Sequence, residues 1–379
     1  MISKLEFILQ TSIEKILEPF EYIHVATEED NDDLLNFYKN ESMQLKNESI
    51  SFTRGNDFFA FYKSTSEKYW CIKFINKDKK ISGIGTILRH HRNINGEIKP
   101  IAYFCDMRIS AHANRITRFQ WRKGFQLIIE NLNNLGPDDY CVSAYTAILE
   151  LNNHALNAFT QGKRGVLHKF LGKYYIHSFI NNGIFTKNRY RVKEISKKDF
   201  CDFYHSHTNS SLLAEAEIYS LKKIEYIDRK SDYIGIYDND KLCAIASPIF
   251  KNRARGLKIQ GLKGVKKLAT DSLKLLDRPK MQENGELRTL DISYFTYSND
   301  LLLNDVENII SSIQNWIKNE NFLKDIHIVN IIDTKYKYNL NIFKTGLHFD
   351  TVGHIYELYA ENGVSILPKS DFRFEGTFL

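Results

Sequence analysis

The feature of this sequence that most constrains its fold is an internal repeat, because two copies of one order of motifs must form two copies of one structural unit. Residues 23–40 read IHVATEEDNDDLLNFYKN, and residues 190–207 read YRVKEISKKDFCDFYHSH. Each segment has a strand pattern, a polar turn and an amphipathic helix pattern. The matching residues are Asp33, Phe37 and Tyr38 in the first copy and Asp199, Phe203 and Tyr204 in the second. The sequence therefore predicts a duplicated unit.

The rest of each half continues in the same order. Two hairpin strands are predicted at 58–64 and 81–88 in the first half, and at 233–239 and 242–250 in the second. Apolar residues at intervals of three or four then predict long helices over 116–135 and 304–318. Each half ends with a glycine turn into a last strand, which begins at Gly165 in the first half and at Gly346 in the second.

The repeat divides the chain into an N-terminal amphipathic helix over 1–20, a first unit over 21–185 and a second unit over 186–379. The length of 379 residues supports two units, because single cores rarely grow beyond about 250–300 residues. The predicted fold class is α+β, with helices packed on a mixed sheet in each unit.

Composition excludes several classes of protein. An apolar content of 43% and a charged content of 26% indicate a globular chain rather than a disordered one. The five cysteines are scattered and form no CxxC pair, which is typical of reduced cysteines in the cytoplasm. Cys201, His205 and His207 lack a fourth ligand, so we expect no metal site there. Since no segment is long and apolar enough for a membrane span, we expect a cytoplasmic location.

One stretch is strongly basic, although the formal net charge of the chain is only +6. Residues 251–280 contain ten lysines and arginines, against two aspartates, Asp271 and Asp277. The stretch is interpreted either as a solvated surface insertion or as a site for an acidic substrate or for CoA phosphates. Within it, residues 265–276 predict an exposed amphipathic helix.

The segment after these strands carries a family resemblance. Residues 103–132 read YFCDMRISAHANRITRFQWRKGFQLIIENL, a strand that turns directly into an arginine-rich helix start. This segment resembles the central strand, loop and helix of the GNAT superfamily of N-acetyltransferases. In that element, unpaired N–H groups and the positive end of the helix dipole face the pyrophosphate of the acyl-CoA. The resemblance implies an acetyl-CoA or other acyl-CoA cofactor.

A second segment, VSAYTAILELNNHALNAFTQGKRGV at 142–166, resembles the next strand and helix of the same family. Asn152 matches an asparagine that contacts the cofactor arm, and Phe159 matches a tyrosine that often protonates the leaving thiolate. In the second half, Phe343 holds that tyrosine position, and no asparagine stands at the other. The two segments cover most of the first unit, and the resemblance of the second unit depends on the internal repeat.

The resemblance implies a set of cofactor-binding residues around the helix start and the neighbouring strands. They are Arg108, Ile109, Arg115, Thr117, Arg118, Gln120, Asn152 and Phe159. The chain departs from the family at the phosphate loop, where no glycine follows Arg115 to let phosphates approach the backbone. Either the phosphates lie further out and bind the Arg and Thr side chains, or the site is degenerate. The matching loop of the second half contains Asp300 and Asp305, which would repel phosphate.

Two residues are candidates for a general base, Asp106 and Tyr145. Strand alternation places Asp106 and Arg108 on one face, and Tyr145 lies on the following strand. Each candidate also has a structural interpretation, as a buried group that only makes hydrogen bonds.

The sequence thus supports three functions. The first is acyl transfer from acetyl-CoA or another acyl-CoA to a small-molecule or peptide amine, with no nucleic-acid partner. The second is a binding or regulatory protein that keeps the fold without the chemistry, in line with the missing glycines and tyrosines. The third is aminoacyl transfer from charged tRNA, with residues 251–280 as the RNA contact.

Overall fold

The computed structural model describes most of the chain in ordered elements. The described residues are 11–41, 43–44, 49–160, 165–180, 189–216, 233–250, 255–260, 286–320, 326–335, 348–368 and 371–374. The segment 265–276, for which the sequence predicts an exposed helix, lies outside the described residues, and so does Gly346.

Twelve strands form one continuous sheet, and its order reads as a repeat from both edges. From one edge the strands are β1 (Ile23–Val25), β4 (Lys68–Ile75), β5 (Ile81–Ile94), β6 (Glu97–Ile109) and β7 (Ala144–Leu149). From the other edge they are β9 (Arg191–Glu194), β10 (Ile234–Asp238), β11 (Lys241–Ile249), β14 (Thr289–Tyr297) and β15 (Ile328–Asp333). The duplication predicted from the sequence is therefore present in the strand order.

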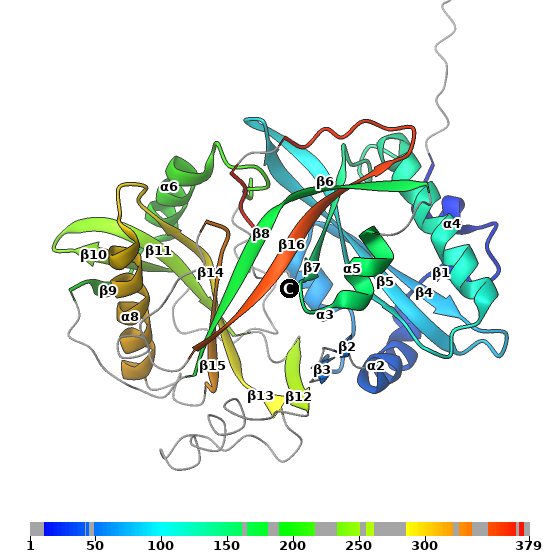
Figure 1. Ribbon diagram of the computed structural model, residues 1–379, viewed down its shortest axis with the longest axis horizontal. Coiled ribbons are helices and arrows are strands. Elements are labelled where there is room, and N and C mark those ends of the chain that lie inside the picture. Colours follow the sequence, from blue (N-terminus) through cyan, green and yellow to red (C-terminus); the bar gives the residue numbers. More distant parts are fainter. Residues whose placement is uncertain are drawn as a thin grey trace, which may run out of the picture.

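The last strand of each half crosses to the other half. Strand β8 (Val166–Ile180) pairs with β15, and β16 (His348–Ala360) pairs with β7. The two long strands also pair with each other along the centre of the sheet, where Figure 1 shows them side by side. The halves on either side of residue 185 therefore share one sheet, in contrast to the separate sheets expected from the sequence.

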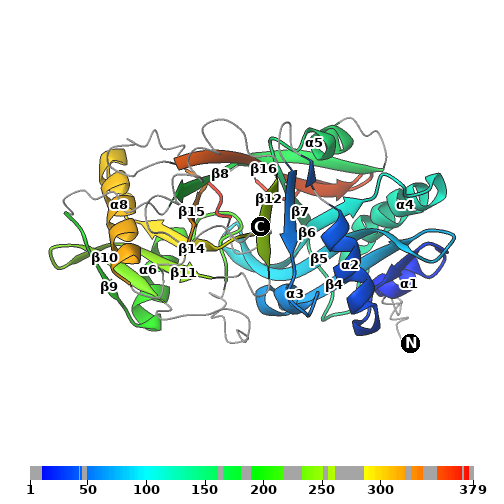
Figure 2. The same ribbon diagram turned by 90° about the horizontal axis from the view of Figure 1, so that it is seen from below.

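Helices cover both faces of this sheet. The two long predicted helices are present as α4 (Arg115–Asn131) and α8 (Leu303–Asn319), each with an apolar face buried in a core. Figure 2 shows α1 (Ile13–Leu17), α2 (Asn31–Asn40) and α4 at one end and α6 (Lys197–Thr208) and α8 at the other. Short elements complete the first half: η1 (Glu28–Asp30), η2 (Leu132–Asn134) and α5 (Asn153–Thr160).

One predicted strand is a helix in the structure, and the predicted N-terminal helix is described only in part. Residues 58–64, predicted as a hairpin strand, instead form the turn and helix α3 (Ala60–Thr65), and β4 pairs with β5 as the hairpin. A short apolar run such as this one fits a buried helix as well as a strand. Of the N-terminal helix predicted over 1–20, residues 11–20 are described, and they contain the short helix α1, in which Ile13 and Leu17 are buried and Ser12 caps the first turn.

A second sheet of four short strands also joins the halves. It contains β2 (Met43–Gln44), β3 (Ser49–Thr53), β12 (Gly256–Gln260) and β13 (Glu286–Leu287). Strand β3 of the first half pairs antiparallel with β12 of the second, and Thr53 lies opposite Gly256. This register brings the residues beyond each of those two positions close together.

Matching bulges in the two halves extend the repeat to single residues. In β6 the residue Asp106 has a φ of 50°, and in β14 Tyr294 has a φ of 55°. At both places two residues lie opposite one residue of the neighbouring strand. A bulge changes which face the following side chains point to. Asp106 and Arg108 consequently face α2, while Met107 and Ile109 pack in the α4 core.

Candidate functional site

The central feature of the first half is a fork between two parallel strands. The backbone ladder of β6 and β7 joins Ala102–Phe104 to Ala144–Thr146. Beyond it β6 runs on to Ile109 and β7 to Leu149, each paired on its outer side. At the base of the fork the Thr146 hydroxyl donates to the Phe104 carbonyl at 2.8 Å. Two strands that separate in this way leave backbone polar groups facing the space between them, where a ligand can pair with them.

The second half has the equivalent fork, but its own side chains lie across it. Strands β14 and β15 pair through Ile292 and Ile331 and then separate. The Tyr297 hydroxyl donates to the Asp333 carboxylate at 3.0 Å. Arg373, in the segment 371–374, donates to the Phe295 carbonyl at 2.8 Å. The same segment accepts a hydrogen bond from Thr334, directly after β15, so it binds both arms of this fork.

Several residues predicted to bind the pyrophosphate at the start of α4 already make hydrogen bonds within the protein. The side chain of Asn114 caps the helix by accepting from the Thr117 backbone, and the Thr117 hydroxyl donates to the Ile75 carbonyl. The Arg118 guanidinium donates to the carbonyls of Ser110, Ala111 and Ala113. Gln120 accepts from the backbone of Tyr22. Arg115 is exposed at the helix start.

The remaining predicted cofactor contacts lie on two sides of the fork. Asn152 caps α5 by accepting from the Ala155 backbone at 3.1 Å. Phe159 lies in α5, and its side chain is outside the described part of the structure. Ile109 packs toward α4, whereas Arg108 points to the opposite face and donates to the Tyr38 hydroxyl at 2.9 Å. The fold thus places Arg108 away from Arg115.

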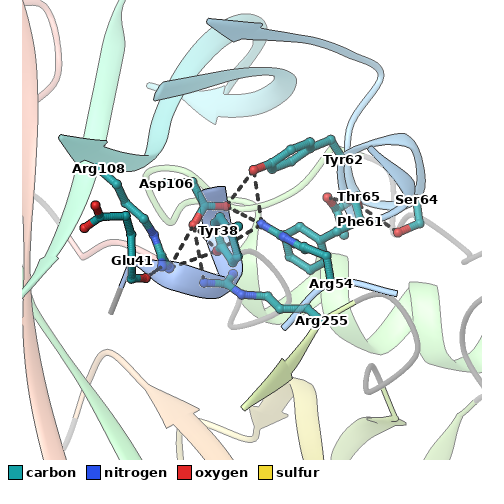
Figure 3. A network of polar contacts seen from close by, with 10 residues as sticks. All are labelled: Tyr38, Glu41, Arg54, Phe61, Tyr62, Ser64, Thr65, Asp106, Arg108 and Arg255. Carbon is teal, nitrogen blue, oxygen red and sulfur yellow. Dashed lines mark hydrogen bonds and ion pairs between the residues drawn. The ribbon is translucent and has the colours of Figure 1, made fainter. Parts of the chain in front are cut away.

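Asp106 lies in a buried cluster of three arginines and two tyrosines (Figure 3). Its carboxylate lies 2.5 Å from Arg54, 3.7 Å from Arg255 and 4.0 Å from Arg108. It also accepts hydrogen bonds from the hydroxyls of Tyr38 and Tyr62, at 2.9 and 2.8 Å. We call these six residues the arginine cluster. Four of them lie in α2, α3 and β6, and Arg54 and Arg255 lie next to one end of the β3–β12 ladder.

The charge of this cluster determines what Asp106 can do. Burial alone would raise the pKa of its carboxyl group, but Arg54, Arg255, Arg108 and the Tyr62 hydrogen bond override burial and lower that pKa well below the usual range. A carboxylate with so low a pKa is a weak proton acceptor. The structure therefore favours the structural interpretation of Asp106 over that of a general base.

Tyr145, the other candidate base, is fully buried in the same core. Its ring stacks on Tyr103 at a centroid distance of 4.8 Å and an angle of 20°. Burial raises the pKa of its hydroxyl, and Arg92 lowers it by a smaller amount. A phenol with a raised pKa is protonated at neutral pH, so this side chain acts as a hydrogen-bonding group.

Sequence reasoning missed Arg54 and Tyr62 and only partly anticipated Arg255. No motif marks Arg54 or Tyr62, and the sequence pattern predicts a strand where Tyr62 lies in α3. Arg255 lies in the basic stretch 251–280, for which an acidic ligand was one interpretation. In the sequence Tyr38 stands out only as a position of the internal repeat. The ring of its counterpart Tyr204 packs against that of the bulge residue Tyr294, with 5.7 Å between the ring centroids.

The second half holds a different network at its bulge. The Tyr294 hydroxyl donates to the carboxylate of Glu215 at 2.6 Å, and Arg92 of the first half pairs with that carboxylate at 2.7 Å. Arg92 and Glu215 thus form a pair of one cation and one anion within the described part of the chain. Across the described ranges, no group of three or more His, Cys, Asp or Glu residues could hold a metal ion, and no helix is long and apolar enough to cross a membrane.

Comparison with solved structures identifies proteins with a similar fold. No protein-family model matches the chain, and neither does any curated protein sequence. Among solved structures, N-myristoyltransferase of Saccharomyces cerevisiae with bound myristoyl-CoA and inhibitors matches with a TM-score of 0.55 and 11% identity, over 90% of this chain and 80% of that one.

A second match comes from a fungal multi-domain β-N-acetylglucosaminidase. That protein, described as containing a GCN5-related glucosamine N-acetyltransferase region, matches with a TM-score of 0.54 and 7% identity, over 89% of this chain and 38% of that one. The mixed sheet, the duplicated strand order and these two likenesses agree. The chain therefore has the fold of the GNAT superfamily, which it shares with N-myristoyltransferase.

Proposed function

We propose that this protein is an acyl-CoA-dependent N-acyltransferase whose acyl-CoA binds in the fork between β6 and β7. The observation that carries the proposal is the early end of the β6–β7 ladder at Phe104 and Thr146, while both strands continue. The pantetheine arm of CoA contains two amides, which can pair with backbone groups on the facing sides of two separated strands. The likeness to a transferase with bound myristoyl-CoA supports the same class of donor.

The choice of the first fork is supported by what occupies the second. Arg373 and the Tyr297–Asp333 hydrogen bond lie across the arms of the second fork. A cofactor arm would have to displace these buried contacts, each of which contributes to stability. The start of α8 also carries Asp305 in its first turn, and its carboxylate pairs with Arg189 at 2.9 Å, so a phosphate there would have to compete with that carboxylate for the cation.

The phosphates of the cofactor are proposed to lie near the start of α4. Thr117 and Arg118 are engaged with backbone groups, so the exposed Arg115 and the helix dipole are the groups left to attract them. The sequence left two alternatives for a loop without glycine, phosphates that lie further from the backbone or a degenerate site. We propose the first, with Arg115 rather than Thr117 or Arg118 as the side-chain contact.

The chemistry needs few groups from the protein. The amine nitrogen attacks the thioester carbonyl, a C–N bond forms and the C–S bond breaks. The amine loses one proton, and the departing CoA thiolate takes up one. Because the pKa of Asp106 is lowered, that carboxylate is not proposed as the proton acceptor. Water can carry the proton, and the fold's main contribution is to hold the two reactants together.

Ligand binding tests this function. Thermal unfolding should shift upward with CoA, acetyl-CoA or myristoyl-CoA, because a ligand that binds only the folded state stabilises it. The most effective chain length identifies the donor, and release of free thiol with a panel of amines measures transfer. Binding of CoA without transfer would support the non-catalytic alternative. A shift with tRNA alone would support aminoacyl transfer.

Charge reversal at Arg115 tests the position of the cofactor. We expect Arg115→Glu to weaken CoA binding about three- to tenfold, since exposed charge contacts contribute about 1 kcal/mol or less and reversal adds repulsion. Isothermal titration measures the affinity. Arg191→Glu, at an exposed arginine of β9, is the matched control and should bind CoA like the wild type. Equal affinities in all three proteins would place the phosphates elsewhere.

A further inference from the structure

The register of the small sheet places two arginines from opposite halves side by side. Thr53 at the end of β3 pairs with Gly256 at the start of β12, so Arg54 and Arg255 are the next residues on the two strands. Like charges directly across an antiparallel pair repel each other. Both guanidinium groups also lie within 4 Å of the Asp106 carboxylate, and the side chain of Arg54 is fully buried.

The arginine cluster has more positive charge than the described residues around it balance. Three guanidinium groups surround one carboxylate. The Nε and Nη1 atoms of Arg54 and the Nε atom of Arg255 are buried, and they have no hydrogen-bond partner among the described residues. By contrast, the network at Glu215 pairs one arginine with one carboxylate. A fold that needed only a structural ion pair would not need the second and third cations.

Aromatic rings offset part of this charge. The Arg255 guanidinium lies 4.2 Å from the Phe52 ring centroid, and that of Arg54 lies 4.8 Å from Phe61. Such contacts contribute about 0.5–2 kcal/mol each, which is small beside the cost of burying an unbalanced charge. These ring contacts do not replace the hydrogen bonds that the buried N–H groups of Arg54 and Arg255 need.

We infer that the arginine cluster binds an oxyanion, and that in the proposed reaction this is the carboxylate of the amine acceptor. The identification of this oxyanion as part of the acceptor rests on the proposed function, whereas the anion site itself rests on the geometry of the cluster. Guanidinium groups suit carboxylates and phosphates because their N–H groups can bind two oxygens at once. The substrate class is thus an amine that carries a carboxylate, such as an amino acid or a short peptide.

The arginine cluster and the proposed phosphate site lie on opposite faces of β6. Asp106 and Arg108 lie on β6 beyond the last residue paired with β7, so the cluster borders the fork. They face α2, whereas α4 packs on the opposite face of the strand with Met107 and Ile109. A cofactor with its pyrophosphate at α4 therefore leaves the arginine cluster to the other reactant.

Anion binding is tested first without any acyl-CoA. Thermal unfolding is followed against inorganic phosphate, acetate, glycine and glutamate, with chloride as the reference at equal ionic strength. At least one probe should raise the unfolding temperature of the wild type in a saturable way. Arg255→Gln should lose this response, and the exposed control Arg191→Gln should keep it. Failure of every probe in the wild type, or an equal response in Arg255→Gln, overturns the site.

Matched acceptors then identify the role of the site. Thiol release is compared for amino acids and for their amides, which keep the amine but lack the carboxylate. In the wild type kcat/KM should be about 10- to 100-fold higher for the acids, as expected for hydrogen bonds to a charged group. Arg255→Gln should remove most of this preference. If an acyl-CoA binds and amides react as well as acids, the acceptor role is wrong; if no acyl-CoA binds, the proposed function fails and the anion site is judged by the thermal test alone.

Discussion

At the scale of residues, Asp106 is the anion on which the arginine cluster depends. We expect Asp106→Asn to lower the free energy of unfolding by about 3–5 kcal/mol at pH 7, because removing one partner of a buried ion pair leaves the other charge uncompensated. Urea unfolding measures the difference. Asp240→Asn is the control, since the side chain of Asp240 is fully exposed and lies 3.7 Å from Arg191. Equal effects of the two substitutions would contradict the prediction.

The pH dependence of the same variant has a definite sign. Arg54 and its neighbours lower the pKa of Asp106 in the folded state below the value of about 3.9 in an unfolded chain. The stability that this group contributes is therefore present above about pH 4 and is lost as the pH falls through its folded pKa. The difference in stability between the wild type and Asp106→Asn should shrink from about pH 5 downward. A difference that grows on acidification would show that the carboxyl is not held ionised.

At the scale of elements, the contact between β8 and β16 leaves no room for a side chain at Gly353. This residue pairs with Tyr174, and a methyl group added there would lie 2.0 Å from the Tyr174 ring, which is fully buried. We expect Gly353→Ala to destabilise the protein by about 1–3 kcal/mol, the usual cost of overpacking. Gly136→Ala is the control because nothing lies within 4 Å of its added methyl group. Denaturant midpoints of the two variants should differ clearly, and matching midpoints would mean that Tyr174 moves aside freely.

At the scale of the whole molecule, the exchange of the last strands makes the two halves interdependent. Without β16, the outer edge of β7 would lose its partner and the ladder from Ala144 to Leu149 would be open. We therefore expect residues 1–185 alone to lack a cooperative unfolding transition, and a mixture with residues 186–379 to recover one. Circular dichroism and size-exclusion chromatography can follow both states. A first half that folds by itself would show that β16 only covers an already stable sheet.

Much of this structure was determined by the sequence alone, because its signals are local. The helices α4 and α8 follow from apolar residues every three or four positions. Asp106 and Arg108 lie on one face of β6 despite the bulge, as strand alternation predicts. Gly165, with a φ of 77°, turns the chain into β8 as predicted. The duplication is also visible in the order of these elements along the chain.

The tertiary structure alone decided the features that depend on contacts between distant residues. Nothing in the local pattern of β8 or β16 indicates whether it pairs with its own half or with the other. The meeting of Arg54 and Arg255 depends on the register of β3 with β12, two strands from opposite halves. Strand pairing and register are set by the packing of whole faces in the folded core rather than by neighbouring residues, so the charged cluster beside the fork emerges only once the sheet is formed.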